Sequence, residues 1–232
     1  VYERANDMAK GAALMTRTTM SSKILGTAWP RHFNKPIAET MYQNIVQVGL
    51  PTWSEADQTL ARAVQREVNS PRDTTGLAVK LDTIGLPVVK PVSGGSDDIG
   101  DISWKVPTVT LRYPSNIPGL QGHHWSNSIA MATPIAHKGV VAGAKVEAMT
   151  LLDLLLQPEL VTQAWDYFKT EQASKFEYVP MVSKDDSPAT YLNKEIMQTY
   201  KPLLTPFYYN EKKYDSYMEQ LGITYPTLKM EN

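Results

Sequence analysis

The stretch from residue 107 to residue 156 constrains the fold most, because it reads as a strand, a polar loop and a long helix. Apolar and polar residues alternate over 107–113, a strand pattern that Pro114 ends. Over 136–156, apolar residues recur at helical spacing. Their face consists of Val141, Ala144, Ala148, Leu152 and Leu155. This order of strand, loop and helix predicts an α/β fold whose mixed sheet is flanked by helices. In such folds, sites form at the ends of strands, where the polar loop would lie.

Three short motifs rich in Gly, Asp and His lie within residues 94–145, and they hold three of the chain's four histidines. The motifs are G-G-S-D-D-I-G-D-I-S-W, G-H-H-W and I-A-H-K-G. Carboxylate and imidazole groups bind divalent metals, and they also exchange protons near neutral pH. The motifs therefore predict part of a hydrolytic metal site.

The histidines are the first candidate ligands. His123 and His124 are adjacent, and neighbouring residues of an extended segment point in opposite directions. One ring is therefore expected in the site, and we assign that place to His123, with His124 supporting it or lying on the surface. His137 begins a helix, where the dipole favours neutral imidazole. A neutral ring there suits metal ligation and a hydrogen bond to a loop carbonyl equally.

The carboxylates give a weaker signal. The turn at 94–95 is followed by Ser96, Asp97 and Asp98, which brings carboxylates to the end of a predicted strand at 88–92. An Asx turn or a helix N-cap uses the same residues and needs no metal. Asp101 follows as a second solvated carboxylate.

A count of possible ligands leaves this site incomplete. The chain has no cysteine, so a metal must be held by His, Asp and Glu, and neither H-x-D nor H-E-x-x-H occurs. Zinc hydrolases need at least three protein ligands and a general base. No G-x-S-x-G motif or phosphate loop is present. The net charge of -1 and the lack of a long apolar run exclude a nucleic-acid or membrane partner and favour a small-molecule substrate.

The first 28 residues predict the end of one domain. Small and apolar residues recur at helical spacing up to Met15, which predicts a helix lying on a sheet. Residues 16–28, rich in Thr and Ser, favour an edge strand. Such a helix and strand lack partners, so we expect the rest of their domain upstream, and the chain to be a fragment. Residues 29–36 mark the crossing into a second domain.

Residues 29–232 are predicted to form that second domain. Helices are expected at 36–48, at 158–170 and from a capping box of Ser54 and Asp57 to about Val68. Residues 69–86 are predicted to be a surface loop, and His32 a surface residue. Residues 171–232 hold eight of the twelve tyrosines, and we expect them to wrap over the surface as short helices, best defined at 191–204 and 211–221.

Four motifs, taken in order, carry a family resemblance. The sequences Y-E-R-A-N-D-M-A-K-G-A-A-L-M-T at 2–16, G-G-S-D-D-I-G-D-I-S-W-K-V-P at 94–107, G-H-H-W at 122–125 and I-A-H-K-G at 135–139 resemble the C-terminal half of the aminobenzoyl-glutamate utilization protein B family. That family is part of the zinc-dependent aminoacylase and carboxypeptidase superfamily of amidohydrolases. The resemblance runs from residue 2 to about residue 156.

The resemblance implies a cytoplasmic enzyme of folate catabolism with two domains. Residues 1–28 would be the last helix and strand of an α+β lid that makes the homodimer, and 29–232 the C-terminal part of the catalytic α/β domain. Two metal ions, zinc or another divalent metal, and an upstream Glu would cleave the amide of aminobenzoyl-glutamate or a similar N-acyl amino acid. Most ligands and that Glu would lie outside this chain.

The resemblance also implies residue roles. The late metal-ligand histidine of the superfamily falls on His123, with His137 as the alternative. His124 stands where the family has a small residue, which leaves the choice of ring open. Asp97 takes a supporting place near the metals, and Asn34 a structural one. Two hypotheses follow: a fragment of a metal-dependent amidohydrolase, inactive alone, or a noncatalytic binding or assembly module that is complete as given.

Overall fold

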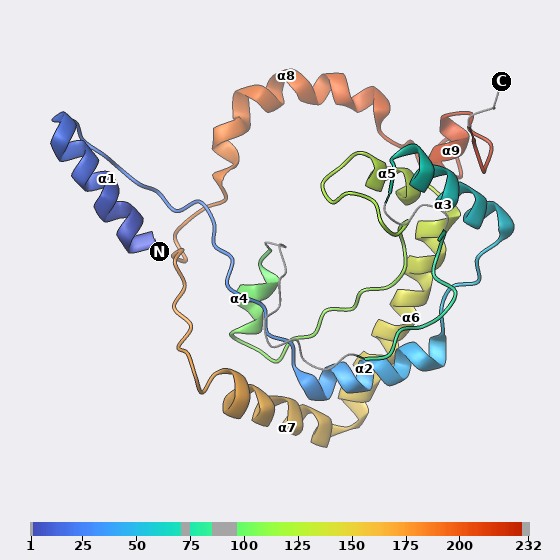
Figure 1. Ribbon diagram of the computed structural model, residues 1–232, viewed down its shortest axis with the longest axis horizontal. Coiled ribbons are helices and arrows are strands. Elements are labelled where there is room, and N and C mark those ends of the chain that lie inside the picture. The colour runs from blue at the N-terminus through green and yellow to red at the C-terminus, as the bar shows by residue number, and fades with distance from the viewer. Residues whose placement is uncertain (1, 71–74, 85–96, 229–232) are drawn as a thin grey trace.

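The computed structural model describes residues 2–70, 75–84 and 97–228 of the chain, and in this part it is a helical protein (Figure 1). The α-helices are α1 (Tyr2–Thr16), α2 (Lys35–Val48), α3 (Glu55–Glu67), α4 (Ile99–Ser103), α5 (Ser126–Met131), α6 (Pro134–Leu156), α7 (Pro158–Tyr167), α8 (Lys194–Leu204) and α9 (Tyr217–Gln220). The π-helix η1 (Phe168–Gln172) and the 3₁₀-helices η2 (Ala189–Asn193) and η3 (Thr205–Phe207) complete the set. None of these helices is both long and apolar enough to cross a membrane.

The predicted α/β fold with a mixed sheet is wrong, because the described residues contain helices and no strand. Strands were expected at 16–28 and 107–113, but Thr16 ends α1, and residues 17–28 and 107–113 have irregular backbone. The carbonyl of Thr108 accepts one hydrogen bond from the backbone N–H of Asn34 at 2.8 Å, and no ladder extends it. A strand pattern becomes a strand only beside a partner. The strand expected at 88–92 lies outside the described residues.

The helix predicted at 36–48 is confirmed as α2. Asn34 caps its N-terminus by accepting from the N–H of Ile37 at 3.4 Å, Pro36 lies in its first turn, and Gly49 ends it with φ 71°. The side-chain amide of Asn44 donates to Thr150 of α6 at 3.1 Å and to Asp153 at 2.8 Å. Caps and proline thus fix the ends of α2, and buried amide contacts fix its place on α6.

The predicted capping box is also confirmed. Ser54 accepts from the N–H of Asp57 at 3.2 Å, and the carboxylate of Asp57 accepts from the N–H of Ser54 at 2.7 Å. The buried side of α3 then contributes Leu60, Ala61 and Val64 to a core that also contains Leu77, Ile117, Ala130 and Ile135. This core joins α3, α5 and the start of α6.

The long helix predicted at 136–156 is confirmed as α6, and the apolar face identified from its sequence is exposed. Val141, Ala144, Ala148, Leu152 and Leu155 lie in solvent, whereas the buried residues are Ile135, Ala136, Gly139, Gly143, Val146 and Thr150. A Cβ on Gly139 would overlap the carbonyl oxygen of Pro114, so the missing side chain lets the loop cross the helix. Because α6 is apolar on both sides, periodicity could not select the packed one.

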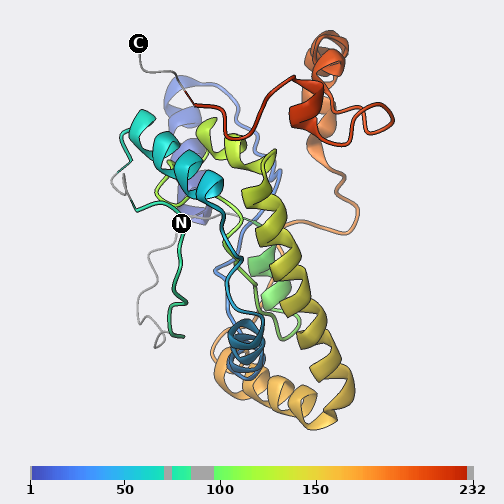
Figure 2. The same ribbon diagram turned by 90° about the vertical axis from the view of Figure 1, so that its right-hand side faces the viewer.

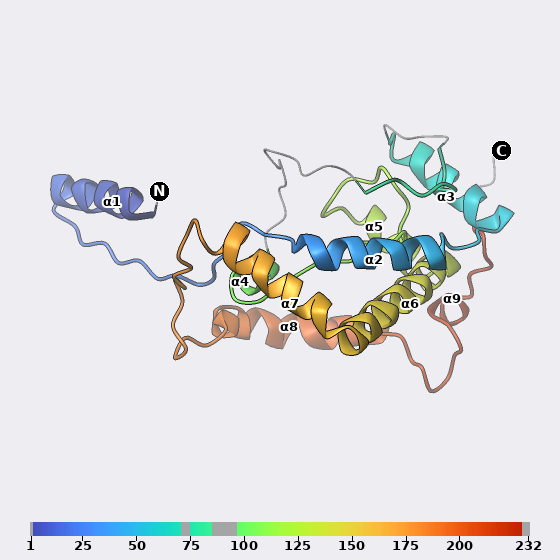
Figure 3. The same cartoon turned by 90° about the horizontal axis from the view of Figure 1, so that it is seen from below.

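The remaining helices lie outside the core formed by α3, α5 and the start of α6. The predicted N-terminal helix forms as α1, contains no buried residue and packs on no sheet (Figures 1 and 3). The helix predicted at 158–170 forms as α7, with Pro158 in its first turn. In the tail, α8 matches the prediction for 191–204, whereas only the four residues of α9 are helical within 211–221.

Candidate functional site

The G-D-I-S-W motif binds the backbone of the segment that precedes α2. The carboxylate of Asp101 accepts from the N–H of Trp29 at 3.1 Å, and the hydroxyl of Ser103 accepts from the N–H of His32 at 3.1 Å. The indole of Trp104 donates to the carbonyl of Pro30 at 2.8 Å. A Cβ on Gly100 would overlap the carbonyl oxygen of Trp29. Four of the motif's residues therefore serve to dock this segment.

His32 was predicted to lie on the surface, but it is half-buried in this docking site. Its ring packs edge-on against Trp104, with the centroids 4.6 Å apart. Burial lowers the pKa of His32, and the charge of Lys175 lowers it further. The ring is therefore kept neutral where it packs.

Asp97 and Asp101, both in the predicted ligand region, contact residues other than the candidate histidines. Asp97 accepts from the N–H of Ile99 at 3.1 Å and lies 3.5 Å from the guanidinium of Arg31. Besides Trp29, Asp101 accepts from the hydroxyl of Tyr178 at 2.8 Å. The segment holding these carboxylates runs into α4, which lies apart from α5 (Figures 1 and 3). The structure does not bring Asp97 to the G-H-H-W motif.

A hollow of about 560 Å³ lies where the end of α3 meets the start of α5. Its lining consists of Glu67, Val68, Asn69, Ser70, Gly119, Gln121, His124, Trp125 and Ser126. Next to the lining, the buried side chain of Gln65 ties α3 to two loops: its amide donates to the carbonyl of Pro118 at 2.9 Å, and its oxygen accepts from the N–H of Gly76 at 2.9 Å. Two larger hollows, of about 970 and 810 Å³, have no histidine in their lining.

His124, rather than His123, lines this hollow. Its Nδ1 lies 2.8 Å from the hydroxyl of Ser126 and accepts from the backbone N–H of Ser126 at 3.4 Å. Because a backbone N–H can only donate, Nδ1 of the neutral ring is unprotonated and the proton is on Nε2. The ring of Trp125, 63% exposed, lies 5.0 Å from that of His124. His124 can thus offer an N–H to an oxygen beside an exposed aromatic face.

His123 sits at the turn before this hollow with φ 56° and an exposed side chain. A residue other than glycine is uncommon in the left-handed region, and such conformations concentrate at functional sites. Asn69, with φ 49°, and Gly119, with φ 82°, border the same hollow. Its rim is therefore built from turns, and His123 projects from one of them.

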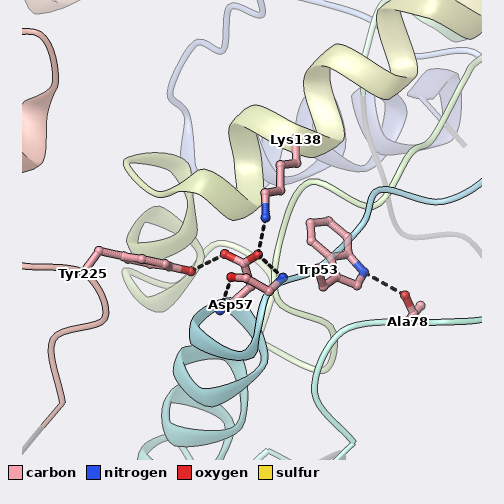
Figure 4. A network of polar contacts seen from close by, with 6 residues as sticks. Trp53, Asp57, Ala78, Lys138 and Tyr225 are labelled. Atoms are coloured by element: carbon pink, nitrogen blue, oxygen red, sulfur yellow. Dashed lines mark hydrogen bonds and ion pairs between the residues drawn. The ribbon is translucent and has the colours of Figure 1, made fainter.

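The I-A-H-K-G motif places His137 in the first turn of α6, exposed to solvent. The next residue, Lys138, makes the specific contact of this motif: its ammonium lies 2.6 Å from the carboxylate of Asp57 (Figure 4). Sequence reasoning missed Lys138, and it assigned Asp57 only a capping role. The sequence signal that could have identified Lys138 was its position beside Gly139, the glycine that lets α6 approach the loop at 114–115.

Asp57 is the centre of a buried polar network (Figure 4). It is 0% exposed, and besides Lys138 it accepts from the hydroxyl of Tyr225 at 2.6 Å. Burial raises the pKa of Asp57, but hydrogen bonds from Lys138, Tyr225 and Ser54 outweigh it and lower the pKa to about 2. Burial and the bond to Asp57 raise the pKa of Tyr225. The network therefore holds an ionised carboxylate that joins α3, α6 and the tail.

The described residues do not by themselves provide a metal site. Across residues 2–70, 75–84 and 97–228, no three His, Asp or Glu side chains are grouped as a metal ion requires. His123, His137 and Asp97 lie on three different segments. No catalytic step can therefore be derived through a metal held by these residues alone.

Comparison with known proteins gives one informative match. No family model matches the chain, and neither does any solved structure. The chain is similar to the B subunit of p-aminobenzoyl-glutamate hydrolase from Escherichia coli (strain K12). The two are 29% identical over 184 aligned positions, which cover 70% of this chain and 38% of the relative. This similarity confirms the resemblance inferred from the four motifs, and its match covers well under half of the relative's length.

Proposed function

We propose that this chain is part of a hydrolase that cleaves the amide bond of p-aminobenzoyl-glutamate or of a similar N-acyl amino acid. The similarity to the B subunit of p-aminobenzoyl-glutamate hydrolase carries this proposal. The match covers 38% of that relative, so the activity is assigned to the full-length protein. The general base and most metal ligands are expected in the remaining part, and the isolated chain is expected to be inactive.

In this proposal the chain contributes one edge of the substrate site. His123 supplies one ligand to zinc or another divalent metal; its exposure and its position on a left-handed turn support that role. His124 donates from Nε2 to an oxygen of the substrate, a role supported by the hydrogen bonds of its Nδ1 to Ser126. The exposed ring of Trp125 offers a surface for an aromatic acyl group.

The assembly of the full-length protein is also a proposal. The relative is named as one subunit of a hydrolase, which supports assembly with a different polypeptide or with a second copy. Residues 1–28 are proposed to be the end of the lid domain through which a homodimer forms. Most residues of α1 are exposed, a few are half-buried and none is buried. The helix is therefore open to a partner. We place the protein in the cytoplasm on the family resemblance.

A noncatalytic binding module is the second candidate, since the described residues lack a complete group of metal ligands. One assay distinguishes the two candidate functions. The full-length protein and this chain are each incubated with p-aminobenzoyl-glutamate, and the release of p-aminobenzoate is followed. Turnover by the full-length protein and not by this chain supports the proposed hydrolase activity. Binding without turnover by the full-length protein in the presence of zinc would favour the binding module, and turnover by this chain would contradict the assignment of the base to the remaining part.

A further inference from the structure

The exposed face of α6 forms one continuous apolar stripe. It begins after His137 and contains Val140, Val141, Ala144, Ala148, Leu151, Leu152 and Leu155, all exposed. Leu155 is 76% exposed, and Val140 and Val141 are 62% and 57% exposed. These positions follow the i, i+3, i+4, i+7 spacing of a single helix face, about 23 Å long at about 1.5 Å per residue. No charged residue interrupts the stripe.

This stripe lies opposite the packed side of α6. The buried residues Gly139, Gly143, Val146 and Thr150 also follow helical spacing, but they are displaced by about half a turn from the stripe. Through that buried side α6 packs on α2, α5 and α7. In Figure 2, α2 and α7 lie beside and below α6, and the opposite side carries no described helix along its lower half. The stripe is therefore left without a neighbour among the described helices.

A helix that is apolar on two opposite sides belongs in the interior of a protein, because a surface helix keeps a polar face toward water. Contiguous apolar patches are also rare on the surfaces of monomers, and they mark places where another surface binds. Two of the four charged side chains of α6 make contacts away from the stripe: Lys138 contacts Asp57, and Asp153 accepts from Asn44. The other two, Lys145 and Glu147, are exposed and lie at the edges of the stripe. With apolar residues on two opposite sides, α6 has the composition of a helix that is packed on both sides.

We infer that the stripe of α6 is an internal interface on which the part of the hydrolase polypeptide outside this chain packs. This inference rests on the proposed function for the existence of that part. The match to the hydrolase leaves most of the relative's length without a counterpart here, so enough polypeptide is available to cover a helix face of this size. The contact is made within one polypeptide, and it places α6 between α2 and a second layer.

Cysteine labelling tests this interface without any catalytic readout. The chain has no cysteine, so Ala148→Cys in the stripe and Gln43→Cys on the exposed side of α2 each introduce one thiol. Each variant is made in the isolated chain and in the full-length protein, and alkylation of the peptide that carries the thiol is followed by mass spectrometry. We expect Ala148→Cys to react at least about tenfold more slowly in the full-length protein, because labelling then requires local opening. Gln43→Cys should react equally in both.

Each other result overturns the inference. Equal labelling of Ala148→Cys in the two proteins would show a solvent-facing stripe. Protection in the isolated chain that grows with concentration, together with a dimer in sedimentation, would show that a second copy covers it. A reading frame that encodes no further polypeptide would remove the proposed occupant. Failure of the hydrolase assay is distinguishable, because a protected stripe in an inactive full-length protein would retain the interface and reject only the activity.

Discussion

The ammonium of Lys138 lies 2.6 Å from the carboxylate of Asp57, 81 residues away in the sequence. Asp57 is fully buried, whereas the side chain of Lys138 is 36% exposed. The pair joins the first turn of α3 to the first turns of α6, and Tyr225 closes it from the tail. A buried carboxylate loses its hydration, so its partners decide whether it is tolerated.

Removing one partner of this pair should destabilise the fold. Lys138→Met leaves the buried carboxylate of Asp57 with Tyr225 and Ser54 only, and we expect a loss of roughly 3 kcal/mol in the free energy of unfolding. Urea denaturation measures it. Lys145→Met is the matched control, because Lys145 is exposed on the same helix, and it should change stability by less than about 0.5 kcal/mol. Equal effects of the two variants would contradict a stabilising role for the pair.

The same carboxylate should make stability depend on pH below 4. Its pKa is about 2 in the folded chain against 3.8 for an unperturbed aspartate, so the unfolded state binds more protons between these values. Stability contributed by Asp57 is therefore fully present above about pH 4 and is lost as the pH falls toward about 2. Denaturation at a series of pH values should show this loss, and Asp57→Asn should remove its share of it. An unchanged slope in Asp57→Asn would contradict the lowered pKa.

Local chemistry made the helix ends predictable from sequence. Ser54 and Asp57 exchange hydrogen bonds within one turn, and Pro36 and Pro158 sit in first turns, so each signal lies within a few residues of what it determines. Strands depend on partners elsewhere in the chain. Within the part of the chain that the structure describes, the pattern at 107–113 meets a single backbone–backbone hydrogen bond, from Asn34, and stays irregular.

Long-range contacts explain what the sequence left undetermined in the site. The motifs at 97–104 and 135–139 were singled out from their Gly, Asp and His residues, but their spacing does not reveal that Asp101 binds Trp29 or that Lys138 binds Asp57. Local reasoning favoured one ring of the adjacent histidines for the site. The hollow is lined by His124 instead. The turn before this histidine is held by Gln65, which donates to the carbonyl of Pro118, and by Ser70, which donates to that of Gly119. The metal-ligand roles of His123, His137 and Asp97 remain predictions.

The glycine of the G-D-I-S-W motif should be intolerant of a side chain. In Gly100→Ala the new Cβ would overlap the backbone carbonyl of Trp29, so the segment must shift at a cost of about 1–3 kcal/mol. Thermal unfolding is followed by the fluorescence of the five tryptophans, of which Trp29 and Trp104 lie at this contact. Gly11→Ala is the control, because nothing lies within 4 Å of its Cβ and the change favours helix. A Gly100→Ala protein as stable as the control would contradict this docking.

Substitution of the two candidate metal ligands, His123 and His137, should affect the full-length protein to different extents. We expect His123→Ala to lower kcat for p-aminobenzoyl-glutamate and the bound metal content together, because a ligand is removed. His137→Ala should have the smaller effect on both, since it changes an exposed residue in the first turn of α6. Metal content is measured by elemental analysis of each purified variant. Equal effects, or a larger effect of His137→Ala, would reassign the ligand.

The tautomer of His124 can be observed directly in this chain. Because Nδ1 accepts from the backbone N–H of Ser126 and faces its hydroxyl, we expect the neutral ring to carry its proton on Nε2. Long-range ¹H–¹⁵N spectra of the histidine rings, recorded in alkaline buffer, distinguish the two nitrogens. Ser126→Ala removes the hydroxyl but keeps the backbone donor, so it should preserve the tautomer while shifting the Nδ1 resonance. His123, exposed at the preceding turn, is the internal control and should not change. A proton on Nδ1 of His124 would instead leave Nε2 as an acceptor and exclude the proposed donation to substrate.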